Sequence, residues 1–153
     1  MFATTEGTDR YQKRLAGGAQ SGHFRRLGDL YVSSIGLGTY LGNSDSSTDR
    51  LYQQSIIRAV ELGCNVLDSA INYRCQRSER LIGQALSWLA REGKLQRNEV
   101  IVSTKGGFLP YDEAPPPDAW AFIQENFITP GVFSPQDIVA GCHCLAPPYL
   151  RHM

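Results

Sequence analysis

Between residues 35 and 104, short β-prone segments alternate with segments of helical periodicity. The β-prone segments are 35–39, 65–68 and 99–104. The segments between them carry apolar residues at helical spacing: Leu51, Ile56, Ala59, Val60 and Leu62 in the first, and Leu81, Ile82, Ala85, Leu86 and Leu89 in the second. Strands that alternate with helices predict a parallel sheet with right-handed crossovers. The chain is therefore predicted to have an α/β fold.

The predicted helices have recognisable ends. Ser47 or Thr48 is placed to cap the first helix, and Gly63 follows its last apolar residue as a natural stop. Ser78 is predicted to cap the second helix, with Glu79 in its first turn, where the helix dipole favours a negative charge. These signals fix the approximate length of both helices.

The segments before and after this core have a different character. Residues 1–22 are polar and are predicted to be a flexible leader. Residues 23–33 predict a β-hairpin that turns at Gly28 and Asp29. Residues 108–135 are predicted to be a long loop or insertion, and its aromatic residues, Trp120, Phe122, Phe127 and Phe133, would line a pocket or form a small core of their own.

Composition excludes several classes of function. The 153 residues carry 15 Lys plus Arg against 15 Asp plus Glu, so the net charge of zero gives no support for a nucleic-acid partner. No apolar run approaches the ~20 residues that span a bilayer. Four cysteines without a recognisable secretory signal favour free thiols and a cytoplasmic location. The sequence therefore predicts a cytoplasmic globular protein with no membrane partner.

Polar residues gather where the predicted strands end. Asp68 ends the second strand, Tyr73 follows in the next loop, and Lys105 ends the third strand. A tyrosine is a poor acid at neutral pH, and a nearby ammonium stabilises its phenolate. Asp68 is placed to hold Lys105 by a charge-assisted hydrogen bond. The three side chains therefore predict a site that transfers a proton, at the strand edge where (β/α)8 barrels carry their chemistry.

Five motifs from about Phe24 to Gly107 resemble the N-terminal half of an aldo-keto reductase. They are GLGTY at 36–40, AVELG at 59–63, DSAINY at 68–73, SERLIGQAL at 78–86 and STK at 103–105. The resemblance implies the N-terminal portion of a (β/α)8 TIM barrel with a leading β-hairpin, so that residues 23–153 form a partial domain of this type. Beyond residue 107 the resemblance is weak.

The resemblance also implies an activity and a site. It implies an NADP(H)-dependent oxidoreductase that interconverts small aldehydes or ketones and alcohols by hydride transfer. Tyr73 matches the general acid, and Asp68 and Lys105 match the residues that tune it. The residues that match the cofactor-binding positions are Gly38, Thr39, Tyr40 and Asp68.

Two departures from the family pattern bear on this expectation. Arg74 stands where the family often has glycine, and a bulky cation there is expected to change the loop and the mouth of the site. The family also uses a histidine at the end of its fourth strand. Neither His143 nor His152 fits that position, because they lie before or inside the helix predicted to begin near Pro147.

Two other interpretations are weighed beside the enzyme. The first is a truncated, non-catalytic fragment that associates with itself or with a complementary half, because three strands cannot close a barrel and leave open edges. The second is a metal site at Cys142, His143 and Cys144. No second Cys/His cluster completes a tetrahedral set, so no metal is predicted.

Overall fold

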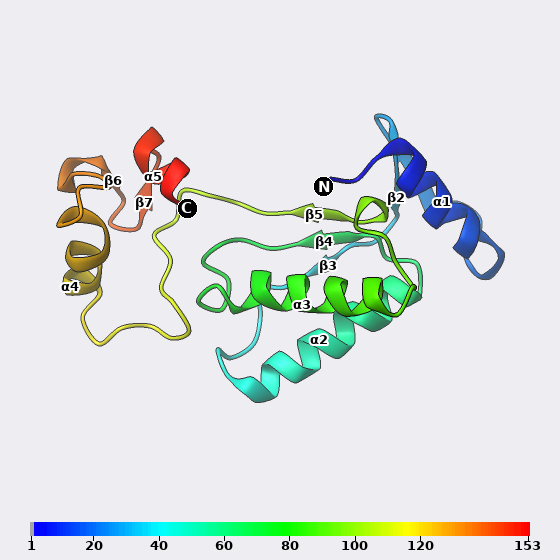
Figure 1. The fold of residues 1–153 in the computed structure, drawn as a ribbon, viewed down its shortest axis with the longest axis horizontal. Helices are drawn as coiled ribbons and strands as arrows, with labels where there is room; N and C mark the ends of the chain where they lie inside the picture. Colours follow the sequence, from blue (N-terminus) through cyan, green and yellow to red (C-terminus); the bar gives the residue numbers. More distant parts are fainter. Residues whose placement is uncertain (1) are drawn as a thin grey trace.

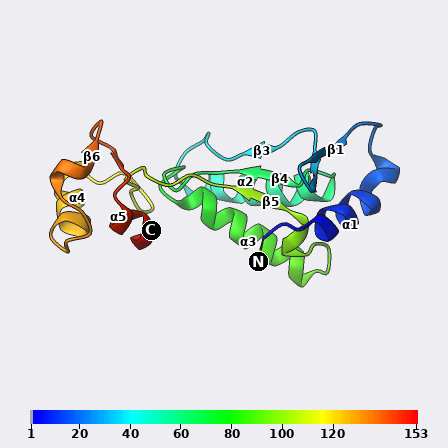
Figure 2. The same cartoon turned by 90° about the horizontal axis from the view of Figure 1, so that it is seen from above.

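The computed structural model describes residues 2–153, and its centre is a three-stranded parallel sheet. The strands β3 (Leu37–Gly38), β4 (Val66–Asp68) and β5 (Ile101–Ser103) lie in the order β3-β4-β5. Helices α2 (Ser46–Glu61) and α3 (Arg77–Arg91) connect them and lie together on one face (Figures 1 and 2). The predicted α/β class is confirmed. Within residues 2–153 the strands do not close a barrel, so a (β/α)8 barrel stays a prediction.

The main hydrophobic core lies between the sheet and its helices. Ile56 and Val60 from α2 meet Leu81, Ala85 and Leu89 from α3. Leu67 of β4 and Val100 before β5 complete the contact from the sheet. The apolar periodicity therefore identified the buried face of α3, but for α2 the expected Leu51 and Leu62 are exposed.

The helix starts differ from the predicted ones. The cap of α2 is Asp45, whose carboxylate accepts a hydrogen bond from the Thr48 backbone N–H at 2.7 Å, whereas Ser47 only donates to that carboxylate. Helix α3 follows Gln76 and has no side-chain cap. Ser78 instead donates its hydroxyl to the carbonyl oxygen of Thr39 at 2.6 Å, so it joins α3 to the segment after β3.

The predicted hairpin is confirmed, and the predicted flexible leader is wrong. Strands β1 (Phe24–Leu27) and β2 (Leu30–Ser33) pair antiparallel. Ahead of them, helix α1 (Thr5–Leu15) is followed by a short 3-10 turn, η1 (Ala16–Gly18), while Met1 lies outside the described residues. The helix is ordered because Thr4 caps it and because its Tyr11 ring is buried in the main core.

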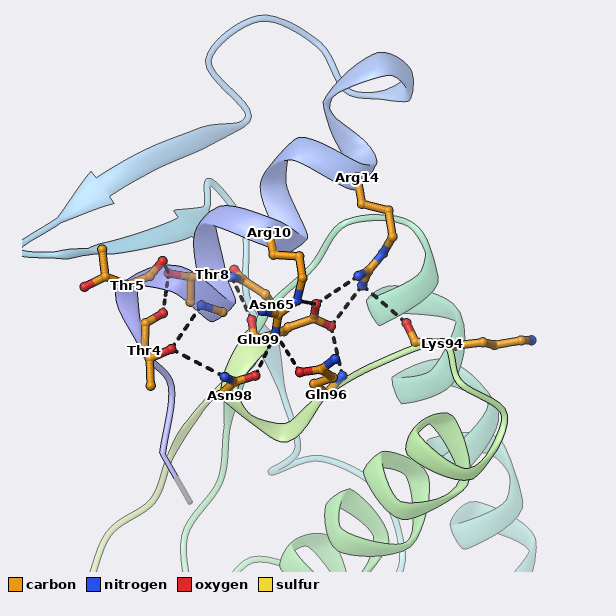
Figure 3. A network of polar contacts seen from close by, with 11 residues as sticks. Thr4, Thr5, Thr8, Arg10, Arg14, Asn65, Lys94, Gln96, Asn98 and Glu99 are labelled. Atoms are coloured by element: carbon orange, nitrogen blue, oxygen red, sulfur yellow. Dashed lines mark hydrogen bonds and ion pairs between the residues drawn. The ribbon is translucent and has the colours of Figure 1, made fainter.

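A buried carboxylate anchors α1 to the amino end of the sheet (Figure 3). Glu99 belongs to the 3-10 turn η2 (Arg97–Glu99), and its side chain is only 1% exposed. Arg10 donates to it at 2.9 Å, and Arg14 makes two contacts at 2.9 and 3.0 Å. The backbone N–H of Gln96 adds a fourth donor at 2.9 Å. A buried charge needs such partners, so α1 and Glu99 depend on each other.

The residues after β5 form a second unit at the opposite end of the sheet from α1 (Figures 1 and 2). Its elements are α4 (Ala119–Ile123), the π-helical turn η3 (Gln124–Ile128), the 3-10 turn η4 (Pro135–Asp137), β6 (Ile138–Val139), β7 (His143–Cys144) and α5 (Pro147–His152). Strands β6 and β7 pair antiparallel. The helix expected to begin near Pro147 is confirmed as α5.

This second unit has its own small core. Leu109, Ile123, Phe127, Phe133, Cys144 and Tyr149 form a buried cluster separate from the main one. The Phe127 and Phe133 rings stack 5.6 Å apart, and Tyr149 meets both edge to face. Residues 108–135 are therefore partly helical and packed rather than a long loop, because their aromatic side chains bury one another. Of the two uses weighed for these rings, Phe122, Phe127 and Phe133 form the small core, whereas Trp120 is 52% exposed.

Candidate active site

Asp68 and Lys105 meet at the carboxyl edge of the sheet. Asp68 ends β4 and lies opposite Ser103 in β5, so Lys105 extends from the neighbouring strand end. The Lys105 ammonium donates to both carboxylate oxygens of Asp68 at 3.0 and 2.9 Å, and to the Ser69 carbonyl oxygen at 2.7 Å. The predicted ion pair is therefore present.

The ammonium also faces the phenol ring of the loop between β4 and α3. Lys105 Nζ lies 4.8 Å from the centre of the Tyr73 ring. Tyr40 also packs against that ring edge to face, with centroids 5.0 Å apart. The structure thus brings together Asp68, Tyr73 and Lys105, with Tyr40 from the segment after β3 beside them.

Electrostatics keep the amine charged. The hydrogen bond to Asp68 raises the pKa of Lys105 above its usual value, partial burial acts against this, and the adjacent Tyr73 adds to the rise. Both members of the ion pair stay open to solvent, with the Lys105 side chain 50% and the Asp68 side chain 44% exposed. Lys105 is therefore a fixed positive charge beside the Tyr73 ring at neutral pH.

The residues expected to bind a cofactor divide into two kinds. Gly38 and Tyr40 are exposed, and a Cβ built on Gly38 would meet nothing within 4 Å, so an open surface adjoins Asp68. Thr39, by contrast, is fully buried, and its hydroxyl donates to the Asp68 carbonyl oxygen at 2.9 Å. Gly38, Tyr40 and Asp68 therefore lie open to solvent at the sheet edge, whereas the buried Thr39 side chain is hydrogen-bonded within it.

Sequence reasoning missed Ser69, which supports the same edge. Its side chain is buried 3.1 Å from the Thr39 hydroxyl, and its carbonyl oxygen accepts from Lys105. The Ser69 backbone N–H donates to the Ser103 carbonyl oxygen at 2.8 Å and continues the pairing of β4 with β5. A small polar residue directly after a strand-end aspartate was the one available signal.

Arg74 does not lie at the mouth of the site as expected. Its side chain is 1% exposed and pairs with Asp49 of α2 at 2.6 Å. Arg77 binds the same carboxylate at 2.7 Å and also pairs with Glu113. The arginines after Tyr73 are therefore structural ion-pair partners rather than solvated charges, because Asp49 faces them from the neighbouring helix.

The histidines and cysteines near the chain end belong to the second unit. His143 packs edge to face against Phe108 at 4.8 Å and lies 3.1 Å from the Cys142 sulfur, while His152 packs against Phe127. Cys144 points into the small core. Across residues 2–153, no three His, Cys, Asp or Glu side chains are grouped so as to hold a metal ion.

The assembled groups suit a particular step. An ammonium fixed by a carboxylate, beside a phenol at an open sheet edge, is suited to stabilising a phenolate as that phenol gives up a proton.

In residues 2–153, no helix is both long and apolar enough to pass through a bilayer.

Comparison with known proteins relates these residues to one family. The profile of the Aldo/keto reductase family matches residues 34–127, which is more than half of the chain. The match includes Tyr40, Asp68, Tyr73 and Lys105, and it ends within the second unit.

Individual relatives match over the same part of the chain. The NADH-specific methylglyoxal reductase of Escherichia coli is 35% identical over 86 residues, covering 53% of this chain and 24% of its own length. The chloroplastic pyridoxal reductase of Arabidopsis thaliana is 36% identical over 97 residues, covering 56% and 26%. A solved aldo-keto reductase from Bacillus halodurans, in its holo form, is 31% identical, with coverage of 56% and 26% and a TM-score of 0.45. The chain spans about a quarter of the length of these curated relatives.

Proposed function

This chain belongs to the aldo/keto reductase family, and on that premise we propose that it carries the proton-donating side of a carbonyl reductase site. The observation that carries the proposal is the contact of Lys105 with both Asp68 and Tyr73. The substrate class is small aldehydes or ketones, and the products are the corresponding alcohols.

Each residue has a separate role in this proposal. The Tyr73 hydroxyl gives its proton to the carbonyl oxygen as negative charge develops there. Lys105 stabilises the phenolate that remains, and Asp68 fixes Lys105 by its two hydrogen bonds. When bound, a reduced nicotinamide supplies the hydride that adds to the carbonyl carbon.

The cofactor is proposed to be NADP(H), resting near Gly38, Tyr40 and Asp68. The exposed surface beside Asp68 supports a nicotinamide site, and Tyr40 offers a flat face next to the Tyr73 ring. The Escherichia coli relative is named as NADH-specific. The preference for the phosphorylated cofactor is therefore tested directly against NADH.

Two measurements on the purified 153-residue chain test the function. Titration of NADPH and NADH, followed by nicotinamide fluorescence, should give saturable binding that is tighter for NADPH. Reduction of an aldehyde with the bound cofactor should fall by roughly 10²-fold or more in Tyr73→Phe, the usual scale of general-acid catalysis. Tyr31→Phe, on strand β2 at the other end of the sheet, is the matched control. Full turnover in Tyr73→Phe would remove the acid role.

The alternative is a protein that depends on association and is not catalytic alone. The observation that favours it is the open edge of the sheet. Within residues 2–153, β3 pairs only with β4, and exposed Ile35 and Leu62 flank an apolar groove beside it. Such edges favour pairing with another chain. Sedimentation at increasing concentration should then reveal self-association, and no cofactor should bind. A compact monomer that unfolds cooperatively would contradict this alternative.

A further inference from the structure

The chain turns sharply directly after Tyr73. Arg74, Cys75 and Gln76 have φ angles of 51°, 54° and 68°, so three consecutive residues other than glycine adopt the left-handed conformation. This region is disfavoured for residues that carry a Cβ, and such runs persist only where surrounding contacts hold them. The contacts around Arg74 show which groups hold this left-handed run in place.

The Arg74 guanidinium is buried beneath the segment that connects β3 to α2. Its Nε and Nη2 donate to the carbonyl oxygen of Asn43 at 2.9 and 2.7 Å, and Nη2 also reaches Asp49 at 2.6 Å. The guanidinium lies 4.7 Å from the centre of the Tyr52 ring, and the Tyr52 hydroxyl donates to the Leu41 carbonyl oxygen at 2.6 Å. One side chain therefore joins α2 to the segment 41–43.

That segment begins directly after Tyr40, the residue whose ring packs against Tyr73. Arg74 is covalently next to Tyr73 and is hydrogen-bonded three residues beyond Tyr40. It therefore connects the two loops that deliver the paired rings. Its Nη1 is buried with no hydrogen-bond partner in residues 2–153.

We propose that Arg74 is a positioning residue for Tyr73. It acts through Asn43 and Asp49 to hold the Tyr73 ring in contact with Tyr40 and Lys105. The proposal rests on the proposed function in one respect, namely that Tyr73 is the proton donor. The geometric claim itself can be measured without cofactor or turnover.

The test is the distance between the two rings in solution. In the unaltered chain, the ring protons of Tyr40 and Tyr73 should give a nuclear Overhauser contact, and the Lys105 methylene signals should be shifted by the Tyr73 ring. Arg74→Gly removes the guanidinium and also relieves the left-handed strain. We expect it to lose both signals, because the backbone alone does not hold the ring.

Two further variants keep the test sharp. Arg74→Lys retains the charge and should recover part of the ring contact through Asp49, since one ammonium cannot reproduce the paired hydrogen bonds to Asn43. Arg80→Ala, in the first turns of α3, removes exposed pairs with Asp112 and Glu113 and should leave both signals intact. Signals of the Tyr11 ring in α1 report whether each variant is folded.

The outcomes separate this proposal from the catalytic one. An intact Tyr40–Tyr73 contact in Arg74→Gly would overturn the positioning role, whatever the chain does to carbonyl compounds. Should Arg74→Gly fail to fold, Arg74→Lys decides: full retention of the contact overturns the proposal, and partial loss supports it. If Arg74→Gly loses the Tyr40–Tyr73 contact while Tyr73→Phe retains full turnover, Arg74 remains a positioning residue and Tyr73 is not the proton donor.

Discussion

Lys105 binds both carboxylate oxygens of Asp68, at 3.0 and 2.9 Å, from the neighbouring strand end. The pairing follows from the register of a parallel sheet, which places Asp68 opposite Ser103, two residues before Lys105. Chemistry-bearing residues 37 positions apart in the chain thereby share one edge. The same ammonium then approaches the ring of Tyr73.

Asp68→Asn should lower the pKa of Lys105 toward the usual lysine value. The hydrogen bond to Asp68 is the largest cause of its raised pKa, and an amide removes the charge that sustains it. The raised pKa stabilises the fold below the ordinary lysine pKa of about 10.4, and this stabilisation is lost as pH rises through the folded-state value. Titration of the Lys105 side-chain NMR signal measures the pKa of Lys105. Glu61→Gln, which removes the distant partner of Lys94, is the control. An unchanged Lys105 titration in Asp68→Asn would contradict the pairing.

Glu99→Gln should destabilise the chain by about 3 kcal/mol, the scale for breaking a buried ion pair. The substitution leaves Arg10 and Arg14 without their shared carboxylate. Urea unfolding measures the difference, and Asp9→Asn, which affects only the exposed pair with Lys13, should cost no more than about 0.5 kcal/mol. Equal effects of the two substitutions would refute an anchoring role for Glu99.

The effect of Glu99 should depend on pH. Burial raises the pKa of its carboxyl, but hydrogen bonds from Arg14, from the Gln96 backbone and from Arg10 outweigh burial and hold the pKa below its usual value. The stabilisation is therefore present above the ordinary glutamate pKa of about 4.3 and is lost as pH falls through the folded-state value. In urea unfolding, the difference in the free energy of unfolding between the unaltered chain and Glu99→Gln should therefore become smaller as the pH is lowered.

Gly7→Ala should destabilise the chain although alanine is the better helix former. A Cβ on Gly7 would lie 2.1 Å from the backbone oxygen of Asn98, so α1 would have to move away from η2. We expect a loss of roughly 2 kcal/mol from overpacking. Gly83→Ala in α3 is the matched control, because its Cβ would meet nothing within 4 Å. That control should gain roughly 0.5–1 kcal/mol, and a similar gain for Gly7→Ala would show that α1 is not docked.

Phe127→Ala should loosen the second unit and leave the sheet unaffected. Phe127 contacts both Phe133 and Tyr149 in a core separate from the main one, and losing a buried phenylalanine costs about 3–5 kcal/mol. Amide hydrogen exchange separates the units: the Cys144 N–H, bonded to Gly107, should exchange faster, and the Ile101 N–H, bonded to Asn65, should not. Exchange of both amides at equally raised rates would mean a single cooperative unit. Trp120→Ala, at a half-exposed ring, serves as the control.

The sequence predicted the parts of the fold that depend on local pattern. Helical spacing identified the buried face of α3 but only part of that of α2, for which the expected Leu51 and Leu62 are exposed. Strand-end positions were enough to pair Asp68 with Lys105, because parallel strands end at a common edge. Gly63, with a φ of 103°, ends the first of these helices as expected.

The rest depends on partners that are distant in the chain. Nothing near residues 5–15 indicates that Glu99 will bind their arginines, so a polar helix was predicted as a flexible leader. Arg74 was likewise expected at the mouth of the site, because the sequence does not show that Asp49 and Asn43 lie beside it. In both cases, a charged side chain is buried by contacts with another element of the fold, which the local sequence does not reveal.

The anchoring of α1 has a consequence for the order of folding. The contacts from Arg10 to Glu99 and from Arg14 to Glu99 span 89 and 85 residues, and an isolated helix of this length is marginal in water. During synthesis, α1 emerges before the sheet, whereas its anchor emerges only after both crossover helices have been made. The docking of α1 is therefore a late, long-range event, because the helix cannot pack against the amino end of the sheet until Glu99 has been synthesised.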